Sequence, residues 1–404
     1  MRIIVQKYGG SSVKDPERIK RVASRLVKAY DEGYSVIAVV SAMGDTTDEL
    51  IAKAREITSR PPRREMDMLL STGEQISIAL LAMAIDALGY PVVSLTGKQV
   101  GIRTDSVHTK ARIQHVDTTR LMKELGAGRI VIVAGFQGVD DYDEITTLGR
   151  GGSDTTAVAV AAAVGAEVCE IHTDVDGVYT ADPRVVKDAR KLADISYGEM
   201  LEMASLGAVV LQPRSVEYAA NHGVRIHVRN SSHDKPGTLV QEERCMEKDM
   251  VVIGVAHDTN VAKVAMLNVP DRPGVAYKIF SRLAEEGINV DMIVQTSKER
   301  QVTDMVFSVN SDDAPLARTI TEELSRELDA GDVLVDDTLA KVSIVGAGMV
   351  SNPGVAARMF EALAEENINI EVISTSEIKV SCLIAAEHVE RAVQALHAKF
   401  GLGG

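Results

Sequence analysis

Cysteine is scarce in this chain of 404 residues, which contains only Cys169, Cys245 and Cys382. These residues are too far apart to form a CxxC metal or redox pair, and their odd number does not fit a disulfide framework. Such usage indicates a reducing compartment. The N-terminal apolar run from Ile3 to Val5 is too short for the hydrophobic segment of a signal peptide. The sequence therefore predicts a cytoplasmic protein.

Long hydrophobic runs and an excess of positive charge are also missing. The longest apolar tract, from Ala157 to Ala166, has about ten residues, whereas a membrane span needs about 20. The chain has 44 Lys and Arg residues against 58 Asp and Glu residues, a formal net charge of -14. Nucleic acid would meet general repulsion, although a local cationic pocket could still bind a small anion. We therefore expect neither a membrane nor a nucleic acid as a partner.

What is present is the composition of a folded, multidomain protein, with 45% hydrophobic and 25% charged residues. At roughly 100 to 200 residues per domain, the length predicts two or three domains, each able to bury a core without disulfides. Periodic segments give way to polar residues between Asn230 and Asp249, which predicts a domain boundary there. The expected domains cover residues 1–245, 264–337 and 338–404. A strand at residues 250–257 is expected to belong to the pair formed by the last two domains.

The first half of the chain alternates short β-branched runs with longer segments of helical period. Such alternation predicts an α/β sandwich whose sheet is mostly parallel at its centre. Asp15 and Pro16 mark a helix start, because aspartate can cap the first N–H groups and proline suits the first turn. The expected strands cover residues 2–5, 35–40, 91–95, 129–134 and 167–172, and the expected helices cover residues 17–30 and 67–88.

The second half contains an internal repeat at an offset of 80 residues. The segment from Pro273 to Ile293 shares 12 of 21 positions with the segment from Pro353 to Ile373. Each copy predicts a strand, an amphipathic helix, two further strands and a closing helix. Because such a module leaves an unpaired strand edge, we expect the two modules to join edge to edge. A duplicated module with a purely structural role is the alternative.

Gly346 and Gly348 follow a predicted strand, as in a dinucleotide-binding loop. Ser351 stands at the third glycine position, and too little chain follows for a nucleotide-binding unit. The internal repeat explains this segment better.

Two glycine-rich motifs lie between a predicted strand and a helix, where backbone N–H groups can bind an anion. In the first motif, Lys7 is followed by Gly9, Gly10, Ser11 and Ser12. The glycines would let N–H groups approach phosphate oxygens, and the lysine would neutralise charge on a transferring phosphoryl group. Because the lysine precedes the glycines, the motif is not a Walker A loop. A plain Gly-Gly turn is the alternative.

The second motif is Gly149-Arg150-Gly151-Gly152-Ser153-Asp154, which opens an Ala- and Val-rich helix. Arg150 could hold a carboxylate through two hydrogen bonds, and Asp154 could orient Lys7. An aspartate-capped helix is the simpler alternative.

An acidic segment, from Thr173 to Arg184, follows a buried strand, where α/β sheets bind ligands. Its Asp-x-Asp-Gly start is similar to a calcium loop, but the later ligands and the closing glutamate are missing. A nucleotide loop, with Asp174 and Asp182 near ribose, phosphates or hydrated Mg²⁺, is the sharper hypothesis. A solvated acidic turn is the alternative, and no set of metal ligands is predicted.

Together these segments resemble the aspartate kinases, members of the amino-acid kinase fold, over nearly the whole chain. The family blocks K-F-G-G-T-S, V-S-A-M-G, S-x-G-E and G-R-G-G-S-D correspond to residues 7–12, 40–44, 71–74 and 149–154. The stretch from Thr173 to Arg184 is similar to the family's nucleotide loop, and the repeat is similar to its two ACT modules. The resemblance implies an α/β fold, an αβα sandwich of the amino-acid-kinase type, followed by two ferredoxin-like βαββαβ ACT modules.

The resemblance implies that ATP, with Mg²⁺, phosphorylates the β-carboxylate of L-aspartate to 4-phospho-L-aspartate, the first step toward lysine, threonine and methionine. Lys7 and Asp154 would be catalytic. The residues implied in ATP binding are Lys7, Tyr8, Gly9, Gly10, Ser11, Thr173, Asp174, Tyr179, Asp182, Pro183 and Arg184. Those implied in aspartate binding are Ser41, Thr47, Glu74, Arg150, Gly151, Gly152 and Ser153, with Arg150 on the α-carboxylate and Glu74 on the ammonium group.

The ACT resemblance implies feedback by amino-acid effectors bound between paired modules, with threonine and lysine as the expected inhibitors. The implied effector-binding residues are Asp271, Arg272, Gly274, Val275, Ala276, Asn289, Asp291, Gln295, Asn369 and Ile370. The resemblance also implies a homo-oligomer. A shorter C-terminal subunit that starts at Met246 or Met250 is a further hypothesis.

One residue departs from the family pattern. Many relatives have a nucleotide-contacting lysine in G-A-K-V-L, where this chain has Val209, so a raised KM for ATP or altered purine selectivity is expected. A different amino-acid kinase is one competing interpretation, against which the ACT repeat argues. A non-catalytic amino-acid sensor is another. Val209 is its only support, because Lys7, Arg150 and Asp154 all remain.

Overall fold

The computed structural model describes residues 1–206, 210–242, 251–297 and 302–404, which form two compact units. The first unit comprises Met1–Val178, Lys191–Ala204 and residues 210–242. The second comprises Tyr179–Arg190, residues 205–206 and the described residues after 250.

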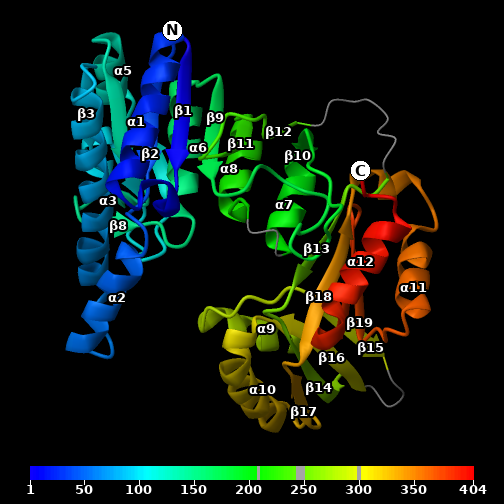
Figure 1. Ribbon diagram of the computed structural model, residues 1–404. Coiled ribbons are helices and arrows are strands. Elements are labelled where there is room, and N and C mark those ends of the chain that lie inside the picture. The colour runs from blue at the N-terminus through cyan, green and yellow to red at the C-terminus, as the bar shows by residue number, and fades with distance from the viewer. Residues whose placement is uncertain (207–209, 243–250, 298–301) are drawn as a thin grey trace. The chain divides into compact units, whose positions relative to one another are not determined.

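An eight-stranded sheet is the centre of the first unit, in the order β10-β12-β11-β9-β1-β2-β6-β3 (Figure 1). All neighbouring strands are parallel except β11 and β12, so the expected parallel centre is confirmed. The inner strands are buried on both faces, as their continuous β-branched runs require. The strands are β1 (Ile3–Tyr8), β2 (Ser35–Val40), β3 (Val92–Leu95), β6 (Ile130–Ala134), β9 (Val168–Thr173), β10 (Asp194–Ser196), β11 (Ile226–Asn230) and β12 (Thr238–Gln241).

Helices cover both faces of this sheet and complete an αβα sandwich. On one face α1 (Pro16–Asp31) and α3 (Arg63–Asp86) bury Leu26 and Leu81 in a common core with the strands. On the other face α6 (Gly152–Val164) packs on β1, β2 and β9, and α8 (Pro213–His222) packs on α6. Asp15 caps α1 as expected, by accepting a hydrogen bond from Arg18 N. The other helices are α2 (Thr46–Ile57), α4 (Gly97–Val100), α5 (Thr119–Gly126) and α7 (Tyr197–Ser205).

A small second sheet in the first unit has the order β5-β4-β7-β8. Its strands are β4 (Ile102–Thr104), β5 (Ile113–Val116), β7 (Gln137–Val139) and β8 (Ile145–Thr147). Strands of three or four residues carry no extended apolar run, so the sequence pattern did not predict them. β8 packs on α3 and leads directly into the Gly149–Asp154 motif.

Helix α3 is, within the described part of the chain, the one helix long and apolar enough to span a membrane. It buries Ile78, Leu81 and Ile85 in the core of the first unit. It also buries the carboxyl groups of Asp67 and Glu74. These contacts are those of a core helix.

Two segments depart from the predicted domain limits. The predicted boundary stretch from Asn230 to Asp249 contains β12, which pairs with β10 and β11 in the first sheet. Residues Tyr179–Arg190, inside the predicted 1–245 domain, belong to the second unit, where Ala181 and Val186 join a hydrophobic core. These contacts are distant in sequence, so no local pattern signals them.

The second unit contains two sheets, in the orders β15-β16-β14-β17 and β13-β18-β20-β19. The first module, with the βαββαβ order, comprises β14 (Ala262–Pro270), α9 (Val275–Glu285), β15 (Ile293–Ser297), β16 (Val302–Val309), α10 (Ala314–Leu328) and β17 (Val333–Asp336). The second comprises β13 (Gly254–Asp258), β18 (Leu339–Val345), α11 (Val355–Glu365), β19 (Val372–Thr375), β20 (Lys379–Ala385) and α12 (Val389–Lys399).

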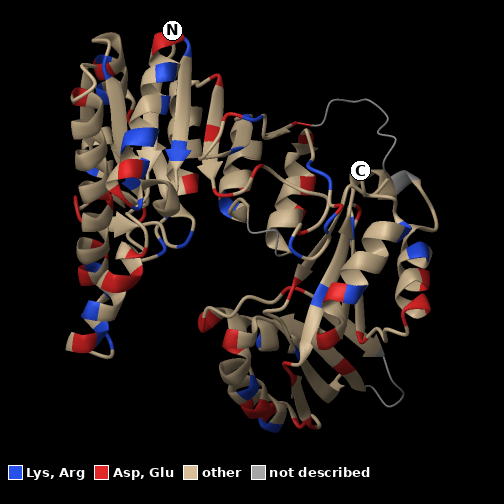
Figure 2. Cartoon of the chain, viewed as in Figure 1, with Lys and Arg blue, Asp and Glu red and all other residues tan. Residues whose placement is uncertain are grey.

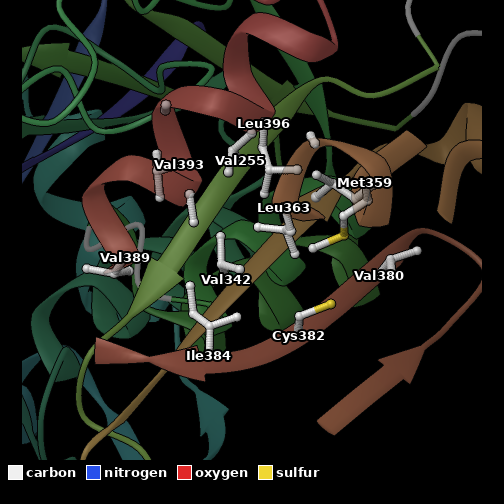
Figure 3. Close-up of a cluster of buried hydrophobic side chains, with 14 of the residues drawn as sticks. Val255, Val342, Met359, Leu363, Val380, Cys382, Ile384, Val389, Val393 and Leu396 are labelled. Atoms are coloured by element: carbon white, nitrogen blue, oxygen red, sulfur yellow. The ribbon is translucent and has the colours of Figure 1, made fainter. Parts of the chain in front are cut away.

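Strand β13 completes the second sheet from a position before the first module in the chain. It pairs with β18, just as β17 pairs with β14. Figure 3 shows the resulting core, in which Val255 of β13 and Val342 of β18 meet Leu363 and Leu396 of the two helices. No ladder joins the two sheets among the described residues, so the expected edge-to-edge joining is not made there within one chain.

Basic and acidic residues are interspersed along the elements of both units in Figure 2. The excess of negative charge is thus spread over the chain and is not gathered in one element.

Candidate active site

The central strands of the first sheet bring the sequence motifs to one edge. Strand β1 lies between β2 and β9, and all three are parallel. Lys7 near the end of β1, Ser41 after β2 and Thr173 at the end of β9 therefore lie at the same carboxyl edge. Ligands bind at this edge in open α/β sheets.

A cleft of about 350 Å³ opens in the first unit at the sites of these motifs. All of the predicted catalytic and aspartate-binding residues line it. The lining comprises Lys7, Gly9, Gly10, Ser41, Ala42, Gly44, Thr47, Glu74, Phe136, Gly149, Arg150, Gly151, Gly152, Ser153, Asp154 and Gln212.

Lys7 and Asp154 form an ion pair in this cleft, with 2.6 Å between Lys7 Nζ and Asp154 Oδ1. The contact is an ion pair without hydrogen-bond geometry, since Asp154 Oδ1 has no hydrogen-bond donor among the described residues. Both side chains are about nine-tenths buried, at 12% and 11% exposed, so solvent screens the pair weakly. The ion pair joins the first glycine motif to the first turn of α6.

Glu74 is a buried carboxyl group that lines the same cleft. Its Oε1 accepts a hydrogen bond from Ala42 N at 3.1 Å, while Oε2 has no partner among the described residues. Burial raises the pKa of Glu74 to about 8, because a charge is poorly solvated there. A cation bound next to Oε2 would compensate the charge, which makes Glu74 suited to an ammonium group.

Arg150 is exposed at the cleft and makes no hydrogen bond or ion pair with any residue that the structure describes. Its guanidinium is therefore available to an anion. The next residue, Gly151, has a φ of 70°, and a Cβ there would lie 1.9 Å from Gln212 Cγ. Only glycine fits this left-handed, crowded position.

The first glycine motif makes a tight turn from β1 into a short 3-10 helix, Gly10–Val13. A Cβ on Gly10 would lie 2.7 Å from Ala42 O, so the close approach of two backbones requires glycine. Two predicted ATP-binding residues do not line this cleft. The Tyr8 side chain is fully buried and stacks on His172. Ser11 is exposed and does not line the cleft.

The predicted nucleotide loop is divided between the two units. Thr173 and Asp174 lie at the carboxyl edge of the first sheet, where Asn230 Nδ2 donates to Asp174 O at 3.1 Å. The other predicted residues, Tyr179, Asp182, Pro183 and Arg184, belong to the second unit. There Arg184 pairs with Asp182 and holds the pKa of that carboxyl below its usual range.

The predicted effector residues are dispersed over the second unit. Asp271, Arg272, Gly274, Val275 and Ala276 lie between β14 and the first turn of α9. Asp291 pairs with Lys341 of the other module at 2.6 Å, and Asn369 donates to Glu371. A cavity of about 590 Å³ is lined by the β15-β16-β14-β17 sheet and by residues 370–373, and of the predicted set only Ile370 lines it. Asn289 and Gln295 do not.

Some cleft residues were not predicted. Phe136 follows β6 and thus also lies at the carboxyl edge, a rule that could have found it. Gln212 precedes α8, far along the chain, and no sequence signal points to it. Val209, Met246 and Met250 lie outside the described residues.

Comparison with known proteins places this geometry in a family. Residues 2–230 match the amino acid kinase family, and residues 264–329 and 342–400 each match an ACT domain. An aspartokinase of Mycolicibacterium smegmatis is 54% identical over 410 residues, covering 100% of this chain and 97% of that protein. The chain belongs to the aspartokinase family. The resemblance seen in the sequence motifs, and the fold that it implied, are thereby confirmed.

Two solved structures of E. coli aspartokinase III are similar to this member of the aspartokinase family over its whole length. The complex with aspartate and ADP, described as the R-state, has a TM-score of 0.84 at 27% identity. The complex with lysine and aspartate, described as the T-state, has a TM-score of 0.78 at the same identity. Each comparison covers 98% of this chain and 99% of the other. As an aspartokinase, the chain is an enzyme.

Proposed function

We propose that the first unit transfers the γ-phosphoryl group of ATP to the β-carboxylate of L-aspartate and forms 4-phospho-L-aspartate. The observation that carries the proposal is the set of charges in one cleft. Lys7 is paired with Asp154, Arg150 has no described partner, and Glu74 has one buried oxygen without a partner. A substrate with two carboxylates and one ammonium group complements the arginine, the lysine and the glutamate.

The chemistry needs little from the protein beyond positioning and charge. The β-carboxylate is ionised at neutral pH, because the ordinary aspartate pKa is about 3.9, so no general base is required. A carboxylate oxygen attacks the γ-phosphorus, the bond to the β-phosphate oxygen breaks, and ADP leaves with the electron pair. Lys7 stabilises the negative charge on the transferring group, and Asp154 holds the lysine in place.

Aspartate is oriented by the remaining side chains of the cleft. Arg150 would hold the α-carboxylate, Glu74 the ammonium group, and Ser41, Thr47 and Ser153 the polar edges. This fixes the β-carboxylate as the acceptor. Gly9 and Gly10, in the turn after β1, would place backbone N–H groups near the ATP phosphates, while Thr173 and Asp174 lie at the adjacent strand end.

Magnesium fits this site as a companion of ATP. Among the described residues no group of three or more His, Cys, Asp or Glu side chains could hold a metal. Mg²⁺ bound with nucleotides commonly uses one or two carboxylates together with phosphate oxygens, and Asp154 and Asp174 are the candidates here. When bound, the ion neutralises charge on the phosphates.

We further propose that the second unit binds threonine or lysine and inhibits the kinase, and that the chain acts as a homo-oligomer in the cytoplasm. The two ACT modules and the lysine complex of E. coli aspartokinase III support this proposal. The product would then serve lysine, threonine and methionine synthesis.

The proposal is tested by measuring ADP release from the purified protein with Mg-ATP. Turnover should require L-aspartate, and L-glutamate should not replace it. Lysine and threonine are then added separately and together, and aspartate-dependent turnover should fall. Turnover without dependence on aspartate would refute the assignment of the acceptor, and insensitivity to both amino acids would refute the assignment of the effectors.

A further inference from the structure

We propose that Asp67 is a positioning residue for aspartate binding. It fixes the segment Thr147–Gly151, here called the substrate loop, without touching the substrate. The inference rests on the proposed function, because it takes Arg150 of this loop as the group that holds the substrate carboxylate. Asp67 lies on α3 and is fully buried, and it does not line the cleft.

Four hydrogen bonds converge on the Asp67 carboxylate. Thr147 Oγ1 donates to Oδ1 at 2.5 Å, and Thr109 N donates to the two oxygens at 3.1 and 3.0 Å. His108 Nδ1 lies 2.8 Å from Oδ2. The contact is a hydrogen bond in the tautomer that has its proton on Nδ1, because a carboxylate oxygen is the acceptor. One buried group thus binds the start of the substrate loop and the neighbouring segment 108–109.

That neighbouring segment packs along the substrate loop. Thr109 has a φ of 70°, a conformation that costs free energy in a β-branched residue and that needs support from its surroundings. Its carbonyl lies so close to Gly149 that a Cβ there would be 3.0 Å from the oxygen. Ala111 N donates to Thr147 O at 2.9 Å. By holding Thr109, Asp67 therefore supports Gly149, directly before Arg150.

Arg214 of α8 joins the same two segments through a second set of hydrogen bonds. Its Nη1 donates to Leu148 O at 2.9 Å, and its Nη2 donates to Ala111 O at 2.8 Å. The backbone on the N-terminal side of Arg150 is thus held at Thr147 and Leu148, while the Arg150 guanidinium stays exposed. The arrangement separates the group that binds from the groups that position it.

The substitution Asp67→Asn tests the inference. Asparagine keeps the volume but offers one acceptor oxygen and turns an NH₂ group toward a donor. We expect the KM for aspartate to rise at least about tenfold while the KM for ATP stays within about twofold. Glu124→Gln is the matched control. Glu124 is also a buried carboxylate of the first unit, paired with Arg120 and Arg129, but it does not line the cleft.

Both variants should lose thermal stability, and only Asp67→Asn should change the KM for aspartate. Hydrogen exchange in peptides covering residues 147–152 should also be faster in Asp67→Asn than in Glu124→Gln. An unchanged KM for aspartate, or exchange that is unchanged, would overturn the inference and leave Asp67 a general stabilising residue.

If Asp67→Asn does not fold, Thr147→Val takes its place. Valine keeps the shape of the threonine side chain but cannot donate a hydrogen bond to Asp67 Oδ1, so the same change in the KM for aspartate is expected. An unchanged KM for aspartate in a folded Thr147→Val protein would overturn the inference. Absence of aspartate-dependent turnover in the unmodified protein would instead refute the proposed function, and the exchange rates would then decide whether Asp67 fixes the loop.

Discussion

At the scale of single residues, the cleft depends on how charges are paired. Lys7 and Asp154 neutralise one another, but Arg150 and one oxygen of Glu74 have no described protein partner. An arginine without a protein partner and a buried carboxyl group with a raised pKa are typical of ligand-binding sites. Their arrangement therefore supports a small substrate that carries both carboxylate and ammonium groups.

Replacing Lys7 with alanine should reduce kcat by at least about 100-fold, as expected when a preorganised electrostatic group is lost. The variant should stay folded by circular dichroism, because the substitution leaves the hydrophobic core between α1, α3 and the strands unchanged. Lys20→Ala is the control, since Lys20 lies on the exposed face of α1 and its one ion pair among the described residues is with Glu17. Near-normal turnover of Lys7→Ala would remove this residue from the chemistry.

Glu74→Gln should change both substrate affinity and the pH dependence of stability. The Glu74 pKa rises from 4.5 to about 8 on folding, so the folded protein binds an extra proton between these pH values. The stabilisation of the folded protein by this proton is complete below pH 4.5 and is lost as the pH rises to about 8. Glutamine does not titrate, so the variant should gain stability relative to the unmodified protein over this range.

The measurement for Glu74→Gln is thermal unfolding without substrate at two pH values, near pH 5 and near pH 9. The higher value lies roughly one unit above the raised pKa of Glu74. The Tm of the variant minus the Tm of the unmodified protein should be more positive at the higher pH. The KM of the variant for aspartate should rise. An equal difference at both pH values would contradict the raised pKa.

Sequence motifs could predict Lys7, Arg150 and Asp154, because each stands in a glycine-rich turn at the end of a predicted element. Their pairing follows from parallel strands and a helix that meet at one edge. Gln212 could not be predicted, because only the folded chain brings it to Gly151. The burial of the Tyr8 ring was not predicted, although alternation along β1 turns this side chain into the core.

At the scale of elements, the glycine motifs work because rigid strands and helices hold them. β1 and β2 fix the two backbones that meet at Gly10, and α6 begins at the second motif. Long periodic elements were predicted closely, such as residues 35–40 for β2 and residues 17–30 for α1. The short strands of the β5-β4-β7-β8 sheet and β12 were missed, because their stability comes from pairing distant in sequence.

The N-terminal cap of α1 gives a prediction at this scale. Asp15→Ala removes the acceptor of Arg18 N and should cost about 1 kcal/mol of local stability. Hydrogen exchange in the first turn of α1 should be faster by about fivefold, which is the same free energy expressed as a rate. Asp15→Asn, which keeps an acceptor oxygen, should exchange nearly as slowly as the unmodified protein. Equal rates in all three proteins would contradict the capping role.

At the scale of the whole molecule, the chain combines a kinase unit with a pair of ACT modules. The domain order could be predicted from the motifs and the repeat. The placement of Tyr179–Arg190 in the second unit could not, because it depends on packing of Ala181 and Val186 against a distant core. This segment connects the predicted nucleotide loop to the ACT unit along the chain.

A prediction about subunits belongs to this scale. If translation also starts at Met246 or Met250, expression from the native gene should yield a second, shorter polypeptide. Mass spectrometry of the purified protein should show both masses. Replacement of both methionines by leucine should remove the shorter one. A single full-length mass from the native gene would exclude the shorter subunit.

The most direct test of the central claim is to identify the phosphorylated atom. The protein is incubated with Mg-ATP, L-aspartate and hydroxylamine, which converts an acyl phosphate into a hydroxamate. Mass spectrometry should find the β-hydroxamate of aspartate, in an amount equal to the ADP released, and almost none with Lys7→Ala. ADP release without the β-hydroxamate, or a product on the α-carboxylate, would contradict the account.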